Sequence, residues 1–78
     1  MLGLHEKDKV LDAIASTRQS LEEARLKEET ASKRVAEAPD KLERFQRSLE
    51  LTVARSIREG YEKALKGLSS HLARKSQI

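Results

Sequence analysis

Two histidines are the residues best suited to chemistry in this chain, and neither stands in a complete motif. His5-Glu6 begins like the HExxH zinc-protease motif, in which two histidines one helical turn apart hold the metal, but residue 9 is Lys. His71 would come near His5 at the open end of a folded-back chain. Because two histidines without a carboxylate or a Cys make a weak metal site, we expect both to be surface residues, with no metal or cofactor.

The acidic residues do not form a catalytic pair. Glu22-Glu23 and Glu28-Glu29 are neighbours in sequence, and adjacent residues of a helix point in different directions. The sequence also has no phosphate-binding glycine loop and no nucleophilic Ser elbow. We therefore expect no catalytic residues and no enzymatic activity.

Basic residues are concentrated in the second half of the chain. Residues 1–38 hold 7 Lys/Arg against 8 Asp/Glu, whereas residues 39–78 hold 9 against 5. Five of the basic residues recur every eleven positions, as in a stripe that follows a phosphate backbone: Arg44, Arg55 and Lys66, with Arg47 and Arg58. Acidic residues one turn away, such as Glu43 and Glu62, can pair with these cations, and aromatic residues for base stacking are scarce. We expect an ion-paired surface; a nucleic-acid-binding accessory protein is the less favoured alternative.

The elements that would carry these side chains are helices. Residues 8–37 contain no Gly or Pro and are rich in Ala, Glu, Lys, Arg and Leu. Apolar residues recur every seven positions on two tracks, the a/d seam typical of helices that pack along their length. One track holds Val10, Ala24, Ala31, Ala38 and Phe45, and the other holds Ile14, Leu21, Val35, Leu42 and Leu49.

A break at Ala36–Asp40 divides this helical pattern. Pro39 lacks a backbone N–H and its ring clashes with the preceding turn of a helix. Asp40 followed by Glu43 is a capping-box pattern that starts a new helix. The sequence predicts a single domain over residues 1–78, with a first helix from about 8 to 37, capped by Asp8, a second from about 41 to 72, and flexible ends.

We predict an all-α fold in which the two helices form an antiparallel, coiled-coil-like hairpin. Folding the chain about residues 38–39 places Val35 opposite Leu42, Ala31 opposite Phe45 and Ala24 opposite Val53, so that large residues face small ones. The alternative is one long helix kinked at Pro39 within a parallel coiled coil, because the seam continues through the proline. An interior proline would cost that helix about 3 kcal/mol.

The second helix has more apolar surface than one neighbouring helix can cover. In the expected hairpin the first helix covers Leu42, Phe45, Leu49, Val53 and Ala64. The remaining apolar surface is the predicted partner-binding face, formed by Leu51, Ala54, Ile57, Gly60, Tyr61, Leu65, Leu68 and Leu72. Gly60, with Ser56 and Ala64 one turn away on either side, would admit a close neighbour. We expect this face to bind another protein or a second copy of the chain, giving a hetero-oligomer or a homodimer.

Composition indicates a small protein that needs a partner for stability. Of the 78 residues, 37% are charged and 3% are aromatic, and there is no Cys to form a disulfide. No stretch has the apolar length of a signal peptide or of a membrane span. We expect a cytoplasmic protein.

The order of features over residues 8–65 adds a family resemblance. A long first helix and a Pro-containing break are followed by Phe45-Gln46-Arg47 and then by Leu51, Val53, Ala54 and Ile57. This order resembles the small two-helix co-chaperones of bacterial type III secretion. In that family, one member joins a tetratricopeptide-like partner, and together they keep the needle subunit unpolymerised in the cytoplasm. This chain is more highly charged than those proteins and has a basic tail, residues 66–78.

The resemblance implies that the apolar face of the second helix engages a co-chaperone. The function we expect is therefore that of a protein-binding adaptor or chaperone-like subunit. A homodimeric coiled coil that serves as a structural spacer is the alternative.

Overall fold

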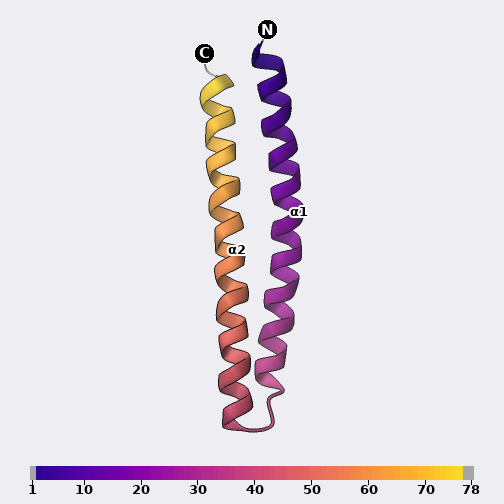
Figure 1. Ribbon diagram of the computed structural model, residues 1–78, viewed down its shortest axis with the longest axis vertical. Helices are drawn as coiled ribbons and strands as arrows, with labels where there is room; N and C mark the ends of the chain where they lie inside the picture. Colours follow the sequence, from indigo (N-terminus) through magenta and orange to yellow (C-terminus); the bar gives the residue numbers. More distant parts are fainter. Residues whose placement is uncertain (1, 77–78) are drawn as a thin grey trace.

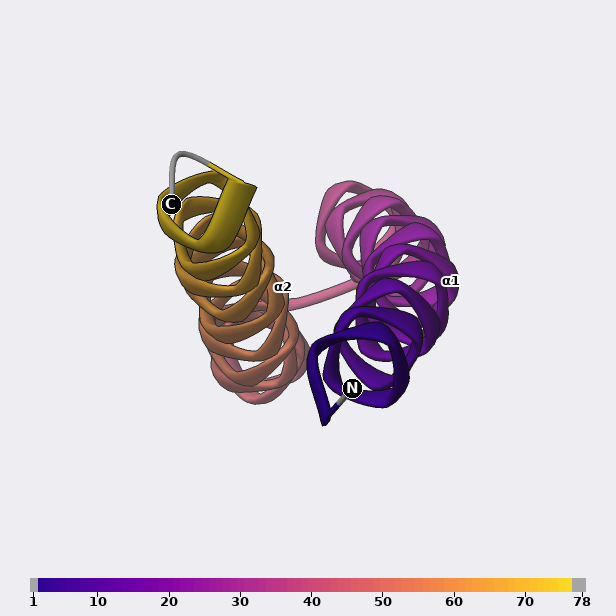
Figure 2. The same ribbon diagram turned by 90° about the horizontal axis from the view of Figure 1, so that it is seen from above.

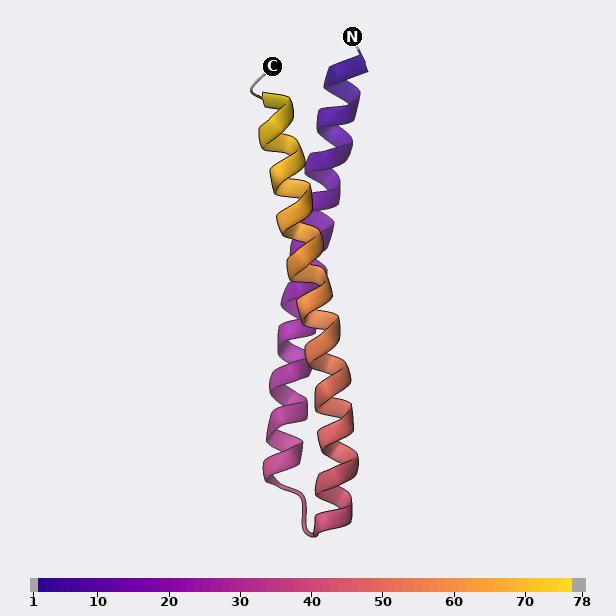
Figure 3. The same ribbon diagram turned by 90° about the vertical axis from the view of Figure 1, so that its left-hand side faces the viewer.

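The computed structural model is a hairpin of two long helices, 61 Å in its longest dimension. It describes the backbone of residues 2–76 and the side chains of residues 8–74. Helix α1 spans Leu2–Ala36 and helix α2 spans Lys41–Ser76. The helices lie antiparallel and side by side (Figures 1 and 2) and cross at a shallow angle (Figure 3). The predicted all-α hairpin with a break at Ala36–Asp40 is confirmed.

The turn between the helices is closed by hydrogen bonds at both helix ends. At the end of α1, the Glu37 N–H donates to the Lys33 carbonyl at 3.0 Å and the Ala38 N–H donates to the Val35 carbonyl at 3.2 Å. At the start of α2, Asp40 Oδ1 accepts a hydrogen bond from the Glu43 N–H at 2.8 Å. Asp40 is therefore the N-cap that the sequence predicts, and it satisfies one of the N–H groups left open at a helix start.

Both helices are longer than predicted. α1 begins at Leu2, so Asp8 lies inside the helix and is not its cap. α2 continues through Gly67 to Ser76, past the expected end near residue 72. A single Gly lowers helix stability by about 1 kcal/mol, which is too little to end a helix whose other residues favour it. Residues 1 and 77–78, at the expected flexible ends, lie outside the described residues.

The seam predicted for α1 faces α2. Four side chains of this seam and the turn are buried, with 4–8% of their surface exposed: Ile14, Leu21, Ala24 and Ala38. Val10, Ala31 and Val35 on the same tracks are half-buried. The seven-residue repeat therefore correctly predicts which side of α1 packs.

The side of α2 that packs is different from the one expected. Leu42, Phe45, Leu49 and Val53 were expected against α1, but they are 53–68% exposed, and Ala64 is exposed as well. The half-buried side chains on the side that packs against α1 include Arg47, Leu51, Ala54, Arg58, Glu62, Leu65, Leu68 and Leu72. Helix α2 is thus rotated about its axis relative to the expected hairpin.

Residue spacing explains this rotation. Leu51, Leu65 and Leu72 lie on one seven-residue track, and Ala54 and Leu68 lie on another, which is the same repeat that α1 carries. By contrast, Phe45, Leu49 and Val53, three of the residues expected in the contact, are spaced by four. A four-residue step advances about 40° around a helix of 3.6 residues per turn, so such a row moves away from a parallel neighbour. Only the seven-residue repeat stays against α1 along its length.

The ion pairs between the helices show that the register is also displaced. Glu28 contacts Arg55 at 3.3 Å and also contacts Arg58, whereas the expected alignment placed Leu49 opposite Glu28. Arg34 Nη1 donates to Glu50 Oε2 at 3.1 Å. The turn occupies residues 37–40, as expected, but the residues of α2 that pair with α1 lie further toward its C-terminus.

Candidate functional site

The exposed apolar surface of α2 is the candidate functional site. Six large apolar side chains of this helix are 37–68% exposed, and we call them the open face of α2: Leu42, Phe45, Leu49, Val53, Ile57 and Tyr61. Most of this face points away from α1, because the opposite side of α2 packs against α1. A patch of this kind on a small protein usually marks a binding surface.

The open face is continuous with the contact between the two helices. Ile57 and Tyr61 line a surface hollow together with Ser20, Ala24 and Lys27 of α1. Tyr61 is 37% exposed and Ala24 is buried. The C-terminal part of the face therefore reaches the edge of the hairpin seam, so that a helix seated there would also contact α1.

A row of small residues runs beside the open face. This small row consists of Ser48, Thr52, Ser56, Gly60 and Ala64, spaced by four. Ser48 Oγ donates a hydrogen bond to the Arg44 carbonyl at 2.7 Å, and Thr52 Oγ1 donates to the Ser48 carbonyl at 3.0 Å. A Cβ atom added at Gly60 would meet nothing within 4 Å. The row is thus low in profile, and two of its hydroxyl donors are already satisfied.

The residues of the predicted partner-binding face divide between two places. Leu51, Ala54, Leu65, Leu68 and Leu72 are half-buried on the side of α2 that packs against α1. Ile57, Gly60 and Tyr61 are exposed. Sequence reasoning assigned Leu42, Phe45, Leu49 and Val53 to the wrong side. Of these four, Phe45, Leu49 and Val53 are spaced by four, whereas Leu51, Leu65 and Leu72 lie on one seven-residue track.

Charged residues join the helices in the middle of the hairpin. Arg58 donates from Nε to Glu28 Oε2, and its Nη1 donates to Glu62 Oε1 at 2.9 Å. Glu62 also contacts Arg25 at 3.7 Å. The side chains of Glu28 and Arg58 are only 19% and 23% exposed. Glu28 and Arg58 therefore lie largely inside the contact between α1 and α2, and Arg25 and Glu62 lie at its more exposed edge.

The same contact shifts the ionisation of both partners. The hydrogen bond from Arg58 lowers the pKa of the Glu28 carboxyl below its ordinary value of 4.5, and this outweighs the rise from partial burial. The hydrogen bond to Glu28 likewise raises the pKa of Arg58. Both groups are therefore held in their charged forms at neutral pH.

Three of the five residues in the predicted basic stripe are engaged within the hairpin. Arg55 and Arg58 contact Glu28. Arg47 donates to the Arg34 carbonyl at 2.8 Å, near the end of α1, and contacts Glu43 at 3.0 Å. These ion pairs partly neutralise the stripe.

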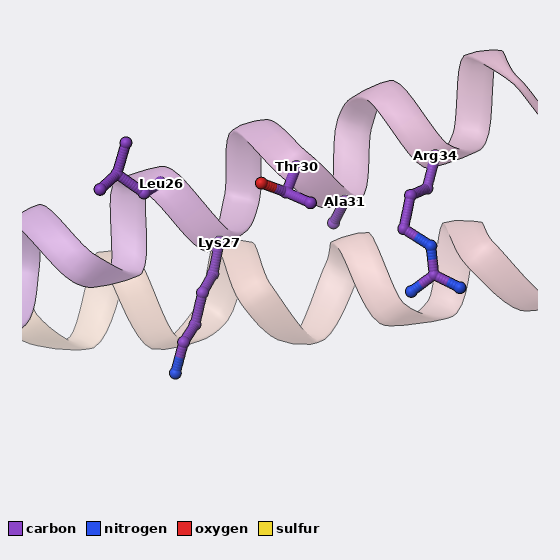
Figure 4. Close-up of a pocket in the computed structure, with 5 residues that line it drawn as sticks. All are labelled: Leu26, Lys27, Thr30, Ala31 and Arg34. Carbon is purple, nitrogen blue, oxygen red and sulfur yellow. The ribbon is translucent and has the colours of Figure 1, made fainter.

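Helix α1 offers a smaller and more polar surface. Leu26, Lys27, Thr30, Ala31 and Arg34 surround an open hollow (Figure 4). In this view Leu26 points away from α2, whereas Ala31 and Arg34 extend toward it. Leu26 is 62% exposed and is an isolated apolar side chain, which makes it a useful control position. Among the described residues, no three His, Asp or Glu side chains gather as metal ligands would; His71 is exposed, and the His5 side chain lies outside that range.

Comparison of the chain with protein-family models, curated proteins and solved structures gives no match. Neither helix, over the part of the chain that the structure describes, has a stretch long and apolar enough to cross a bilayer. The open face of α2 is thus the feature on which a functional proposal rests.

Proposed function

We propose that the chain is a protein-binding subunit that packs the open face of α2 against a helix of another polypeptide. One observation carries this proposal. Only four described side chains are buried, two of them alanines, whereas six large apolar side chains of α2 stay exposed. A hairpin with so small a core gains stability by burying these side chains against a partner. An amphipathic helix is the natural occupant of such a surface.

A more specific proposal follows from the type III secretion resemblance. Phe45, the first residue of Phe45-Gln46-Arg47, is 62% exposed on the open face, which would leave it available to a co-chaperone. On this proposal the chain acts in the cytoplasm, joins a tetratricopeptide-like protein and shields the needle subunit. Co-expression with such a partner and the needle subunit would yield a stable complex that depends on Phe45.

The general proposal is tested by expressing a tagged form of this chain in cells of the native host, together with an untagged copy of the same chain. The tagged chain is then purified, and the polypeptides bound to it are identified. Leu49→Glu places a charge in the open face, and Leu26→Glu places the same charge on α1. We expect the wild type and Leu26→Glu to retain a bound polypeptide and Leu49→Glu to lose it. Equal capture by all three proteins, or capture of nothing by any of them, would overturn the proposal.

A further inference from the structure

We infer that the helix seated on the open face is α2 of a second copy of this chain, related by a twofold axis and crossing obliquely. The inference rests on the general form of the proposed function, because it names the occupant of the same face; it is an alternative to the co-chaperone proposal, which assigns Phe45 to a different partner. It is carried by the spacing of the exposed residues, by the small row beside them and by the absence of charge across both.

Five of the six residues of the open face form a single ridge. Phe45, Leu49, Val53, Ile57 and Tyr61 are spaced by four along α2, and we call this row the ridge. Rows of this spacing are inclined to the helix axis, and two helices that interdigitate such rows cross at about −50°. The face is therefore suited to an oblique crossing. It differs from the seven-residue seam through which α2 packs nearly parallel to α1.

The small row supplies the groove that such a ridge needs. It runs parallel to the ridge, and each of its residues follows a ridge residue by three positions, as Ser48 follows Phe45 and Gly60 follows Ile57. Helix packing of this class places the ridge of each helix into a groove of the other. Because α2 carries both a ridge and an adjacent groove, its surface is complementary to a copy of itself. This is the condition for an isologous contact with twofold symmetry.

The ridge and the small row contain no charged residue in ten positions, although 37% of the chain is charged. Covering these two rows therefore removes no ion from water, which would be costly without a partner charge. The hydroxyls of Ser48 and Thr52 already donate to backbone carbonyls of α2. A partner helix that covers these two rows must itself present an uncharged surface, and α2 of a second copy presents one.

The area available is consistent with a dimer. The ridge side chains are 37–62% exposed, and large aromatic side chains can bury about 150–250 Å², so the ridge offers on the order of 500 Å² per copy. The small row and Leu42 extend this toward the roughly 800 Å² per partner of a stable interface. Ile57 and Tyr61, which border the seam with α1, would bring that helix to the edge of the same interface.

The decisive variants replace the two glycines of α2. Gly60 lies in the small row, whereas Gly67 lies outside it, closer to the C-terminus. A Cβ atom at either position meets nothing within 4 Å in the single hairpin. Leu has a higher helix propensity than Gly, so each substitution favours the helix itself. Gly60→Leu fills the groove that the ridge of the second copy needs, and Gly67→Leu is the matched control.

Molar mass by sedimentation equilibrium, with circular dichroism on the same samples, measures the outcome. We expect the wild type and Gly67→Leu to have twice the 8.8 kDa of one chain. Gly60→Leu should have the mass of one chain and keep its helical signal. A dimer that both glycine variants form equally well would overturn the inference, because the groove would then play no part.

The result for the wild type separates this inference from the proposed function. A monomeric wild type that captures a different protein, and loses it on Leu49→Glu, would overturn the second copy as occupant and leave the proposed function standing. If the wild type is monomeric, and either captures no polypeptide or captures the same polypeptides as Leu49→Glu, then both the second copy as occupant and the proposed function are overturned.

Discussion

Glu28 of α1 and Arg58 of α2 form a hydrogen-bonded ion pair at the centre of the hairpin seam. Each is a charged residue with apolar neighbours on its seven-residue track. Glu28 follows Ile14 and Leu21 on its track, and Arg58 lies between Leu51 and Leu65 on the other. A polar pair at such positions can specify helix register, because any shift leaves both charges facing apolar residues.

Removing one member of this pair should destabilise the hairpin more than removing both. Glu28→Leu leaves Arg58 without its carboxylate partner on α1 and with Glu62 of its own helix, and Arg58→Leu leaves Glu28 with Arg55 alone. We expect each single variant to lower the Tm by several degrees and the double variant to recover most of the loss. Thermal melts followed by circular dichroism measure this. The control is Glu29→Leu, at an exposed position that pairs with Lys33 on its own helix; strictly additive losses at Glu28 and Arg58 would contradict the pairing.

The ion pair also predicts a pH dependence of stability. The pKa of Glu28 in the folded hairpin lies below its ordinary value of 4.5, so the unfolded chain binds this proton more tightly. The stabilisation is complete above that value and is lost as the pH falls through the lower, folded-state pKa. We expect the Tm of the wild type to fall more steeply on acidification than that of Glu28→Gln. Melting curves from about pH 7 to about pH 3 measure the difference; parallel curves would exclude a contribution from Glu28.

The buried side of α1 gives a test of the core. Leu21 is 5% exposed, whereas Leu26 on the same helix is 62% exposed. Leu21→Ala should lower the free energy of unfolding by about 2 kcal/mol or more, because it removes a buried side chain and leaves a cavity. Leu26→Ala should change it by less than about 0.5 kcal/mol, as surface substitutions usually do. Chemical denaturation of both variants measures the difference, and similar losses would contradict the packing of α1.

Local signals in the sequence were sufficient to predict the helices and the turn. Pro39 and the capping pattern of Asp40 and Glu43 act within a few residues, and the structure contains the hydrogen bond from the Glu43 N–H to Asp40. The packing side of α1 was equally clear, because α1 has one apolar seam. These features depend on neighbours in the chain and need no knowledge of how the two helices meet.

The packing side of α2 could not be chosen by counting apolar residues. Helix α2 has two apolar sides, and either could pack against α1. The side with Phe45 and Leu49 continues the seven-residue repeat of α1 through Pro39. What decides between them is a long-range match of spacing and charge. The side with Leu51 and Leu65 keeps the seven-residue repeat and places Arg58 beside Glu28. Treating charged residues on apolar tracks as paired partners would have identified it.

The most direct measurement of the central claim compares two neighbouring positions on α2. Val53 is 59% exposed on the open face, and Ala54 is half-buried on the side that packs against α1. Because the chain contains no Cys, Val53→Cys and Ala54→Cys each introduce a single thiol at a position of similar size. The rate of thiol labelling then reports how accessible each side of α2 is.

In dilute protein we expect the thiol at position 53 to be labelled much faster than the thiol at position 54. Raising the protein concentration should protect position 53, as the open face becomes covered, and leave position 54 unchanged. Faster labelling at position 54 than at position 53 would show that the two sides of α2 are reversed. Labelling at position 53 that stays fast at every concentration, and in the presence of host proteins, would show that nothing binds the open face.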